Sequence, residues 1–130
     1  IISHAKNEIY ATIISSPEEI LANCEGLDVV GIDEAQFFEQ SIVKICNTLA
    51  NDGYRVIVAG LDMDYKGNPF GPMPNLMAIA EYVTKVHAVC VSCGGVAQYS
   101  FRTAANQDTV MLGESDTYEA RCRACFPPLS

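Results

Sequence analysis

The chain has 130 residues, of which 49% are hydrophobic, so it is large enough for one domain with a small appendage and is not expected to be disordered. Its formal net charge of −8 argues against a basic face for a phosphate backbone and excludes nucleic acid as an expected partner. No apolar run approaches the ~18 residues of a membrane-spanning helix, and no signal peptide is recognisable. We expect a cytoplasmic protein without a membrane partner. Because the chain begins inside an apolar stretch without an initiator Met, we also expect sequence to precede Ile1.

The first half of the chain predicts two helices and a strand. Residues 16–24 predict a short helix with Ser16 as its N-cap and Pro17 in the first helical position. Residues 29–32 are apolar and rich in β-branched side chains, which predicts a strand buried on both faces. Residues 39–53 predict a helix that ends at Gly53 and buries Ile42, Ile45, Cys46 and Leu49.

Residues 55–61 predict a second apolar strand, so this region predicts a right-handed βαβ unit with parallel strands. The Gly- and Pro-rich residues 62–75 predict a loop long enough to carry function. A short helix over 75–83, capped by Asn75, and a third strand over 85–91 should follow. Shorter strands and polar turns are expected from there on. We therefore predict an α/β core over 1–88 and a second small domain over 89–130.

Four of the six cysteines form two CxxC pairs, Cys90 with Cys93 and Cys122 with Cys125. Each pair can direct two thiolates at one point, and two such pairs complete the tetrahedral shell of a structural zinc ion. Two disulfides, four free thiols or an iron–sulfur cluster remain alternatives. The other two cysteines stand alone in apolar surroundings, where buried free thiols are usual.

The segment between the outer cysteines contains only three basic residues, Arg102, Arg121 and Arg123. A zinc ribbon that binds nucleic acid would need more positive charge than this. We therefore interpret the ribbon as a clip that organises the loop between its cysteine pairs.

Two adjacent acids, Asp33 and Glu34, follow the first predicted strand. An acid at the carboxyl end of a buried parallel strand is typical of a nucleotide-bound magnesium site, and a neighbouring Glu can accept a proton from an attacking hydroxyl. Alternatively, either acid caps the helix that follows. No G-x-x-x-x-G-K-[ST] phosphate loop occurs in the chain, so either the acids do not serve ATP or this loop precedes Ile1.

The motifs occur in a specific order: GIDEAQFF, then GLDMDYKGNPFG, then CxxC, then YxxxCxxC. In this order and spacing the chain resembles the zinc-containing type II thymidine kinase family over nearly its whole length. The resemblance implies a P-loop NTPase-like (RecA-like) parallel-sheet core, without its N-terminal phosphate-loop part, plus a small zinc-ribbon domain. It also implies transfer of the γ-phosphoryl group of ATP to the 5′-hydroxyl of thymidine, or of deoxyuridine, in nucleotide salvage.

The resemblance also implies roles for individual residues. Glu34 matches the catalytic base and Asp33 the acid that helps hold magnesium, while Asp33, Glu34, Ala35 and Gln36 match the stretch beside the ATP phosphates. Tyr65 stands where many relatives have Phe, and Ser100 where many have Thr. Positions expected around the nucleoside are Phe37, Leu61, Tyr65, Phe70, Ser100, Thr109, Val110, Met111, Leu112, Gly113 and Tyr118.

The implied cofactors are structural Zn²⁺ held by Cys90, Cys93, Cys122 and Cys125, and Mg²⁺ that arrives with ATP. The implied partners are thymidine and ATP, thymidine triphosphate as a feedback inhibitor, and further copies of the chain in a homotetramer. One alternative is a non-catalytic zinc-ribbon interaction module, which leaves the acid pair and the NPFG loop unexplained. Another is an ATPase whose Glu activates water, which leaves the zinc loop unexplained.

Overall fold

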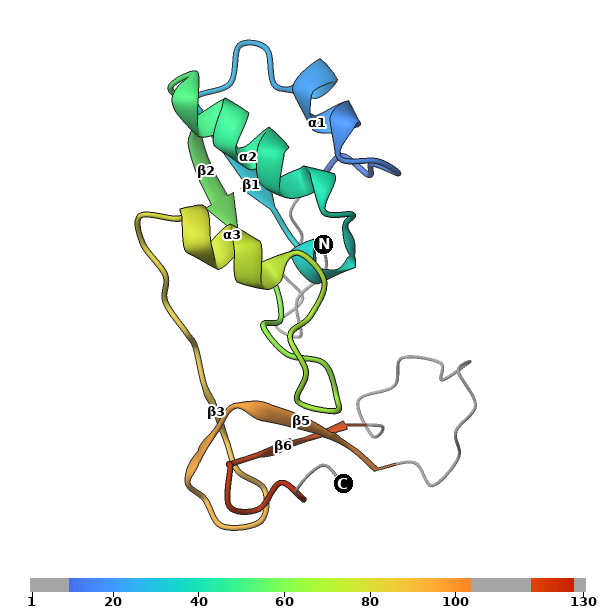
Figure 1. Cartoon of the computed structure of the whole chain (residues 1–130), viewed down its shortest axis with the longest axis vertical. Coiled ribbons are helices and arrows are strands. Elements are labelled where there is room, and N and C mark those ends of the chain that lie inside the picture. The colour runs from blue at the N-terminus through green and yellow to red at the C-terminus, as the bar shows by residue number, and fades with distance from the viewer. Residues whose placement is uncertain (1–9, 104–117, 128–130) are drawn as a thin grey trace.

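The computed structural model describes residues 10–103 and 118–127. Figure 1 shows two parts: helices and a parallel strand pair in the upper half, and antiparallel hairpins in the lower half. The linker that follows α3 joins them along one side, and the loop that follows β2 extends from the upper part toward the hairpins. The protein is therefore a small α/β structure with a hairpin unit at one end.

The predicted βαβ unit is confirmed. β1 (Val29–Ile32) and β2 (Arg55–Val58) pair in parallel, from Val29 opposite Arg55 to Ile32 opposite Val58. The connection contains a single 3-10 turn, η1 (Ala35–Phe37), and then α2 (Ser41–Asn51). Gly53 has a φ of +95° just after α2, a conformation that suits the predicted stop.

The main core lies between the β1–β2 pair and the helices. All four positions predicted for the buried face of α2 are buried, and they pack with Val30 and Ile32 of β1. Burial of β1 on both faces was a wrong expectation for the described part of the chain, because Val29 is 49% exposed. Ile57 of β2 is similarly exposed. In the described residues the apolar cluster therefore packs against only one face of the strand pair.

The first helix, α1 (Glu18–Asn23), is shorter than expected. Its N-terminus is capped by a side chain other than the predicted Ser16. The Glu19 carboxylate accepts hydrogen bonds from the backbone N–H groups of Ser15 and Ser16, at 2.6 and 2.8 Å. This is the backward half of a capping box. These bonds also hold the pKa of Glu19 below its usual value.

The third helix begins earlier than predicted. α3 (Met73–Ile79) starts just after Pro72, so Asn75 lies inside the helix instead of capping it. Asn75 donates a side-chain hydrogen bond to Gln40 at 3.0 Å. The rigid backbone of two prolines, Pro72 and Pro74, explains the earlier start, because proline is well tolerated in a first helical turn.

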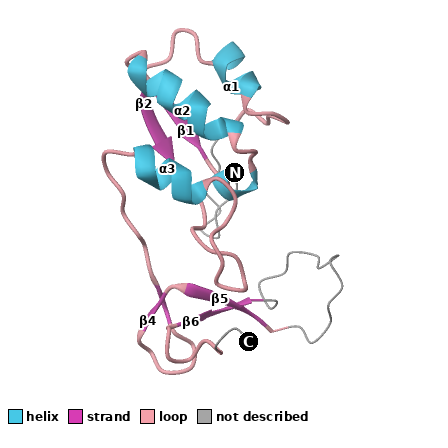
Figure 2. Cartoon of the chain, viewed as in Figure 1, coloured by secondary structure: helices cyan, strands magenta, loops and turns pink. Residues whose placement is uncertain are grey.

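The lower part consists of two short antiparallel pairs (Figure 2). β3 (Ala88–Val89) pairs with β4 (Val96–Ala97), and β5 (Tyr99–Arg102) pairs with β6 (Tyr118–Arg121). The third predicted strand, 85–91, is thus reduced to two residues. It pairs within the hairpin unit and does not join the parallel strands, because the CxxC turn that follows sends the chain straight back.

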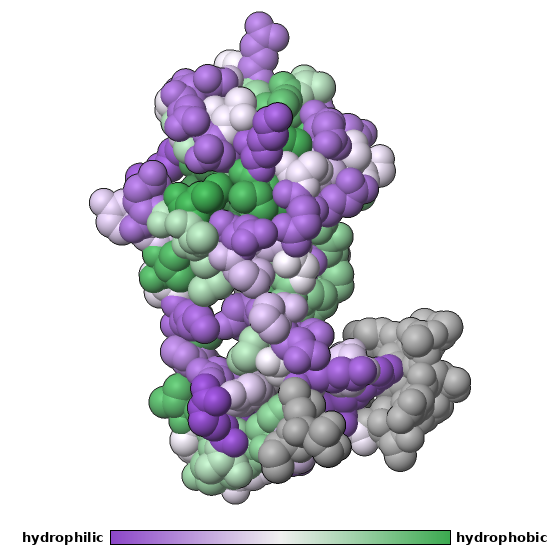
Figure 3. Space-filling model, in the orientation of Figure 1, coloured by the Kyte–Doolittle hydropathy of each residue, from purple (hydrophilic) through white to green (hydrophobic). Residues whose placement is uncertain are grey.

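In the view of Figure 3, neither hydrophobic nor hydrophilic residues form one large continuous surface. Hydrophobic patches lie between hydrophilic ones on both parts. Among the residues that the structure describes, none of the helices is long and apolar enough to cross a membrane.

The buried face of α2 generates a test of the core. Ile42 is fully buried, so Ile42→Ala should lower the free energy of unfolding by about 2–5 kcal/mol through lost contacts and a residual cavity. Val86 is 91% exposed, so Val86→Ala should change it by less than about 0.5 kcal/mol. Urea unfolding of the purified protein measures both, and equal effects would contradict this description of the core.

Candidate functional site

The acid pair lies where the chain leaves β1. Backbone hydrogen bonds continue past the strand, from Ala59 N–H to the Ile32 carbonyl at 2.8 Å and from Ala35 N–H to the Ala59 carbonyl at 3.0 Å. Between them the backbone turns sharply at Glu34, whose φ of +53° and ψ of +40° are left-handed. Glu34 is the only non-glycine residue with positive φ in the described ranges. Such strain is characteristic of functional sites.

The helix-capping alternative does not fit these contacts. Glu34 occupies the N-cap position of η1 but makes no side-chain capping hydrogen bond. Asp33 accepts a hydrogen bond at 2.9 Å from the N–H of Glu34, its immediate neighbour. Both acids are exposed. Their side chains are therefore accessible to a ligand and do not cap a helix.

Gln36 connects the acid pair to the second strand. Its side chain is only 3% exposed. Its amide nitrogen donates to the Glu34 carboxylate at 2.7 Å, while its amide oxygen accepts from the Leu61 N–H at 3.1 Å. Sequence reasoning assigned Gln36 only to the phosphate side and missed this bridge, because nothing in the sequence pairs position 36 with position 61.

Two glycines allow the close packing around Gln36. A Cβ added to Gly60 would lie 2.9 Å from the Gln36 side-chain oxygen, and one added to Gly71 would collide with the Gln36 carbonyl. Gly71 also has a φ of +50°, which L side chains rarely adopt. These two close contacts, at Gly60 and Gly71, place the loop after β2 tightly against the turn that carries the acids.

Asp33, Glu34, Gly60 and Leu61 together line an open hollow of about 310 Å³. Beside η1, Phe37 and Phe70 pack edge to face with ring centres 5.5 Å apart, and Phe37 remains 71% exposed. Leu61 is half exposed. The structure thus brings carboxylates and exposed apolar side chains to the carboxyl ends of the two parallel strands, where α/β folds bind ligands.

The loop after β2 is held together by hydrogen bonds between its own residues. The Asp64 carboxylate accepts hydrogen bonds from the backbone N–H groups of Lys66 and Asn68, at 2.9 and 3.0 Å. The Phe70 N–H donates to the Asp62 carbonyl at 3.0 Å, which closes the base of the loop. The predicted functional loop is therefore ordered by its own hydrogen bonds.

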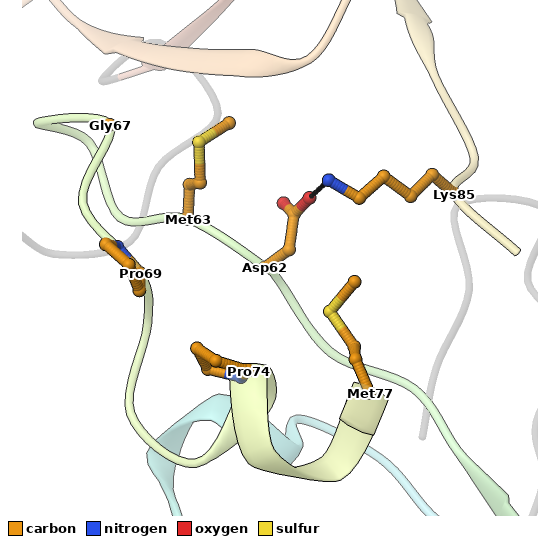
Figure 4. A pocket seen from close by; sticks show the side chains of 7 residues that line it. All are labelled: Asp62, Met63, Gly67, Pro69, Pro74, Met77 and Lys85. Atoms are coloured by element: carbon orange, nitrogen blue, oxygen red, sulfur yellow. Dashed lines mark ion pairs between the residues drawn. The ribbon is translucent and has the colours of Figure 1, made fainter. Parts of the chain in front are cut away.

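A second hollow of about 290 Å³ lies on this loop beside α3 and the linker (Figure 4). An ion pair crosses it, between Lys85 of the linker and Asp62 of the loop, with 2.9 Å between nitrogen and oxygen. Met63 and Met77 also line the hollow. No site residue had been expected here.

The remaining expected nucleoside positions lie at the hairpin end. Tyr65 is at the tip of the loop, under the guanidinium of Arg102. Ser100 lies in β5 and Tyr118 begins β6, where it pairs with Arg102. The stretch from Thr109 to Gly113 (Thr109, Val110, Met111, Leu112 and Gly113) lies outside the described residues.

The four paired cysteines converge. Their sulfur atoms all lie within 4.8 Å of one another, and those of Cys93 and Cys122 are 3.6 Å apart. A tetrahedral zinc site with Zn–S bonds of about 2.3 Å requires sulfurs roughly 3.8 Å apart. All six cysteines are free, which excludes the disulfide alternative here. The cluster is therefore a candidate zinc site with four protein ligands.

Two similar turns present these ligands. In the first, Gly94 N–H donates to the Cys90 carbonyl and Cys90 N–H to the Gly95 carbonyl, both at 2.8 Å, and Gly94 has a φ of +77°. In the second, Phe126 N–H donates to the Cys122 carbonyl at 3.0 Å. Such compact turns hold both sulfurs of a pair on one side.

The thiols influence one another strongly. A hydrogen bond from the backbone of Cys122 lowers the pKa of Cys90 to about 6, while the side chain of Cys122 raises the pKa of Cys125 to about 12. Four sulfurs this close cannot all be thiolates unless a cation lies among them. The donor set therefore fits a divalent metal. In contrast, burial alone raises the pKa of Cys46 to about 11, as expected for an unreactive core thiol.

The three arginines of the hairpin unit lie over aromatic rings. Arg121 is 3.9 Å from the centre of the Phe101 ring and also donates to the Cys125 carbonyl at 3.3 Å. The other two contacts are Arg102 over Tyr65 at 5.0 Å and Arg123 over Tyr99 at 5.5 Å. Arg102 and Arg121 are partly buried, so these two cations contribute to packing within the chain, whereas Arg123 is exposed.

Comparison with known proteins identifies the family. A family model described as thymidine kinase matches residues 1–126. The chain is 55% identical to a thymidine kinase of Bacteroides thetaiotaomicron and 56% identical to one of Bacteroides fragilis, over 126 residues that make up 97% of this chain and 63% of each relative. It is 53% identical to a thymidine kinase of a Rhodothermus species, over 98% of this chain and 60% of the relative.

The chain belongs to the thymidine kinase family, and the resemblance seen in its motifs is confirmed. The four-cysteine cluster agrees with the zinc-containing type II branch. The chain spans less than two thirds of the length of these relatives.

The glycine packing around Gln36 can be tested with a matched pair of variants. Gly26 and Gly71 both have positive φ, but a Cβ at Gly26 would meet nothing within 4 Å. Gly26→Ala should therefore cost only the conformational strain, about 1–3 kcal/mol. Gly71→Ala should cost clearly more, because its Cβ also displaces Gln36. Equal losses in thermal or urea unfolding would show that the close approach at Gly71 is unimportant.

Proposed function

We propose that the protein carrying this chain is a thymidine kinase, which transfers the γ-phosphoryl group of ATP to the 5′-hydroxyl of thymidine and gives thymidine monophosphate in nucleotide salvage. Membership of the family and the names of the relatives support this proposal. The observation that carries it is the strained Glu34, hydrogen-bonded to a buried Gln36 and exposed to a hollow at the strand ends.

Glu34 is proposed as the general base. Phosphoryl transfer depends mainly on positioning and on stabilisation of charge, and it also needs an acceptor for the hydroxyl proton. The Gln36 amide holds one oxygen of the Glu34 carboxylate, and the second oxygen can then accept this proton. The two carboxylates have different partners, because that of Asp33 accepts from the Glu34 N–H and that of Glu34 from the Gln36 amide, which suits different tasks for two adjacent acids.

Asp33 is proposed to face a magnesium ion that arrives with ATP and would neutralise charge on the phosphates. The backbone at Ala35 and Gln36 completes the proposed phosphate side of the site.

In this proposal the α/β part belongs to a P-loop NTPase-like, RecA-like core assigned to residues 1–88. Residues 89–130 form the second domain, in which zinc has a structural role because four protein ligands leave no open position for water.

The proposed nucleoside pocket uses Phe37, Leu61 and Phe70 beside the acids, and Tyr65, Ser100 and Tyr118 toward the hairpins. Flat apolar walls suit a pyrimidine ring, whose edge then needs hydrogen bonds. Backbone groups of Thr109–Gly113 are proposed to supply these bonds. Deoxyuridine, which lacks only the methyl group, is proposed as a second substrate. A cytoplasmic homotetramer inhibited by thymidine triphosphate is proposed from the family resemblance alone.

A non-catalytic zinc-ribbon module is the weaker candidate. Such a module gives no reason for the strained Glu34 or for its bond to Gln36. Its basic residues would also be expected to face a partner, whereas all three lie over rings of this chain.

The assignment of Glu34 can be tested in the full-length protein. Glu34→Gln keeps the size and can still accept the Gln36 hydrogen bond, but it cannot take a proton. Thymidine phosphorylation should fall by roughly 10²–10⁴-fold, with a much smaller effect on thymidine binding. Glu39→Gln, at an exposed acid nearby, is the matched control and should retain the rate. Turnover of Glu34→Gln within about threefold of the parent would rule out the general-base role.

Asp33 should respond differently from its neighbour. Asp33→Asn keeps an oxygen for the Glu34 N–H but removes the charge proposed to face the metal. We expect a higher magnesium concentration for half-maximal rate, measured by magnesium titration at saturating thymidine. Unchanged magnesium dependence would remove Asp33 from the metal side, whatever the result for Glu34.

The metal site also makes a specific prediction. Elemental analysis should find about one zinc per chain, and Cys122→Ser should lose this zinc. The variant should also loosen the segment between the cysteine pairs before the βαβ part unfolds, because the metal contributes directly to the folding of so small a unit. Cys24→Ser, at a buried thiol outside the cluster, should keep its zinc. Less than about half a zinc per parent chain, without iron, would exclude this assignment.

A further inference from the structure

The loop after β2 is contacted by the hairpin unit at two points. Arg102, the last residue of β5, places its guanidinium 5.0 Å from the centre of the Tyr65 ring. At the tip of the loop, a Cβ added to Gly67 would meet the rings of Tyr99 and Phe126 at 3.4 and 3.6 Å. The two regions therefore meet although they are far apart in sequence, and one of the two contacts is made at a ring that belongs to the proposed nucleoside pocket.

The position of Arg102 is set by the hairpin. It pairs directly opposite Tyr118 in the β5–β6 register, and side-chain alternation puts it on the same face of β5 as Ser100. Tyr99 and Phe101 point to the other face, where both pack on Phe126. Since Phe126 directly follows Cys125, this packing connects the strand that carries Arg102 to the metal cluster.

We propose that Arg102 is a positioning residue for the nucleoside site: it holds the Tyr65 ring in place and thereby connects the metal-binding hairpins to the base pocket. The proposal rests on the proposed function, in which Tyr65 forms a wall of that pocket. Arg102 itself contacts neither substrate nor reacting atoms in this assignment.

The chemistry of the contact suits this role. The face of an aromatic ring attracts a cation, and a planar guanidinium can lie over it while remaining charged at any relevant pH. The loop's own hydrogen bonds order its backbone, whereas the Tyr65 ring is 37% exposed, so a contact from outside the loop can restrict the orientation of the ring. Arg102 is partly buried and lies on a paired strand, which makes it a more rigid partner than the loop can provide.

The chain offers a matched control at the same ring. The ammonium of Lys66 lies 5.6 Å from the centre of the Tyr65 ring, a distance similar to that of Arg102. Lys66 is the next residue along the same loop and is exposed, so it moves with Tyr65 and cannot anchor it. If charge over the ring were all that mattered, the two cations would be equivalent.

The first experiment measures steady-state kinetics of thymidine phosphorylation in the full-length protein. Arg102→Met should raise KM for thymidine about two- to fivefold, the range expected for a partly exposed cation–ring contact, with kcat nearly unchanged. Arg102→Lys should recover part of this loss, and Lys66→Met should stay at the parent value.

A double-mutant cycle separates positioning from general destabilisation. Tyr65→Phe keeps the ring, so Arg102→Met should still raise KM in that background. Tyr65→Leu removes the ring, so Arg102→Met should then have no further effect. Equal effects of Arg102→Met in both backgrounds, or equal effects of Arg102→Met and Lys66→Met, would overturn the proposal.

A second readout does not depend on activity. Amide hydrogen exchange of residues 62–70, measured without substrate, should be faster in Arg102→Met than in the parent or in Lys66→Met, at unchanged zinc content. If the parent fails to phosphorylate thymidine, the proposed function fails and this exchange result alone decides whether Arg102 holds the loop. Unchanged exchange in Arg102→Met would overturn the positioning role even in an active kinase.

Discussion

The hydrogen bonds of the Gln36 side chain are the contacts on which the candidate site depends. One end of this buried amide holds the Glu34 carboxylate and the other holds the Leu61 backbone, so the turn after β1 and the loop after β2 have a fixed relation. A buried amide with both ends satisfied is stable, whereas either bond alone would leave a polar group unpaired. The glycines at 60 and 71 follow from this constraint, because only they leave room for the amide and its backbone.

The hairpin unit has a different basis for stability. Its strands are two or four residues long and few of its described side chains are fully buried, so apolar packing alone is a weak source of order. The four converging sulfurs and the stack of Tyr99 on Phe126, with ring centres 4.4 Å apart, supply what the core lacks. Arg121 adds to both, since it lies over Phe101 and donates to the Cys125 carbonyl.

The loop after β2 lies between these two regions. Its base is held by the bridge from Gln36 to Leu61, and its tip contacts the hairpins through Tyr65 and Gly67. The ion pair between Asp62 and Lys85 adds a third contact, to the linker. A change at the metal cluster can therefore reach residues proposed to surround the nucleoside through ordinary packing, because the loop is fixed at both ends.

The sequence by itself determined the elements and motifs whose chemistry is local. Spacing along the chain accounts for the apolar periodicity of α2, the parallel strand pair, the two cysteine pairs and the exposed acids. Where spacing misled, a neighbouring backbone constraint was the reason: Pro72 moved the start of α3, and the CxxC turn shortened the strand before it. The exposed side of β1 shows the limit of composition, since the same apolar residues suit a strand covered on one face or on both.

Tertiary structure alone decided the contacts between distant positions. The bridge from Gln36 to Leu61 and the contact of Arg102 with Tyr65 join residues 25 and 37 positions apart, and no propensity or short motif encodes such pairs. The left-handed backbone at Glu34 likewise lies between two hydrogen bonds to Ala59, the residue that follows β2. Local patterns reflect interactions within a few residues, whereas the geometry of a site depends on which segments the folded core brings together.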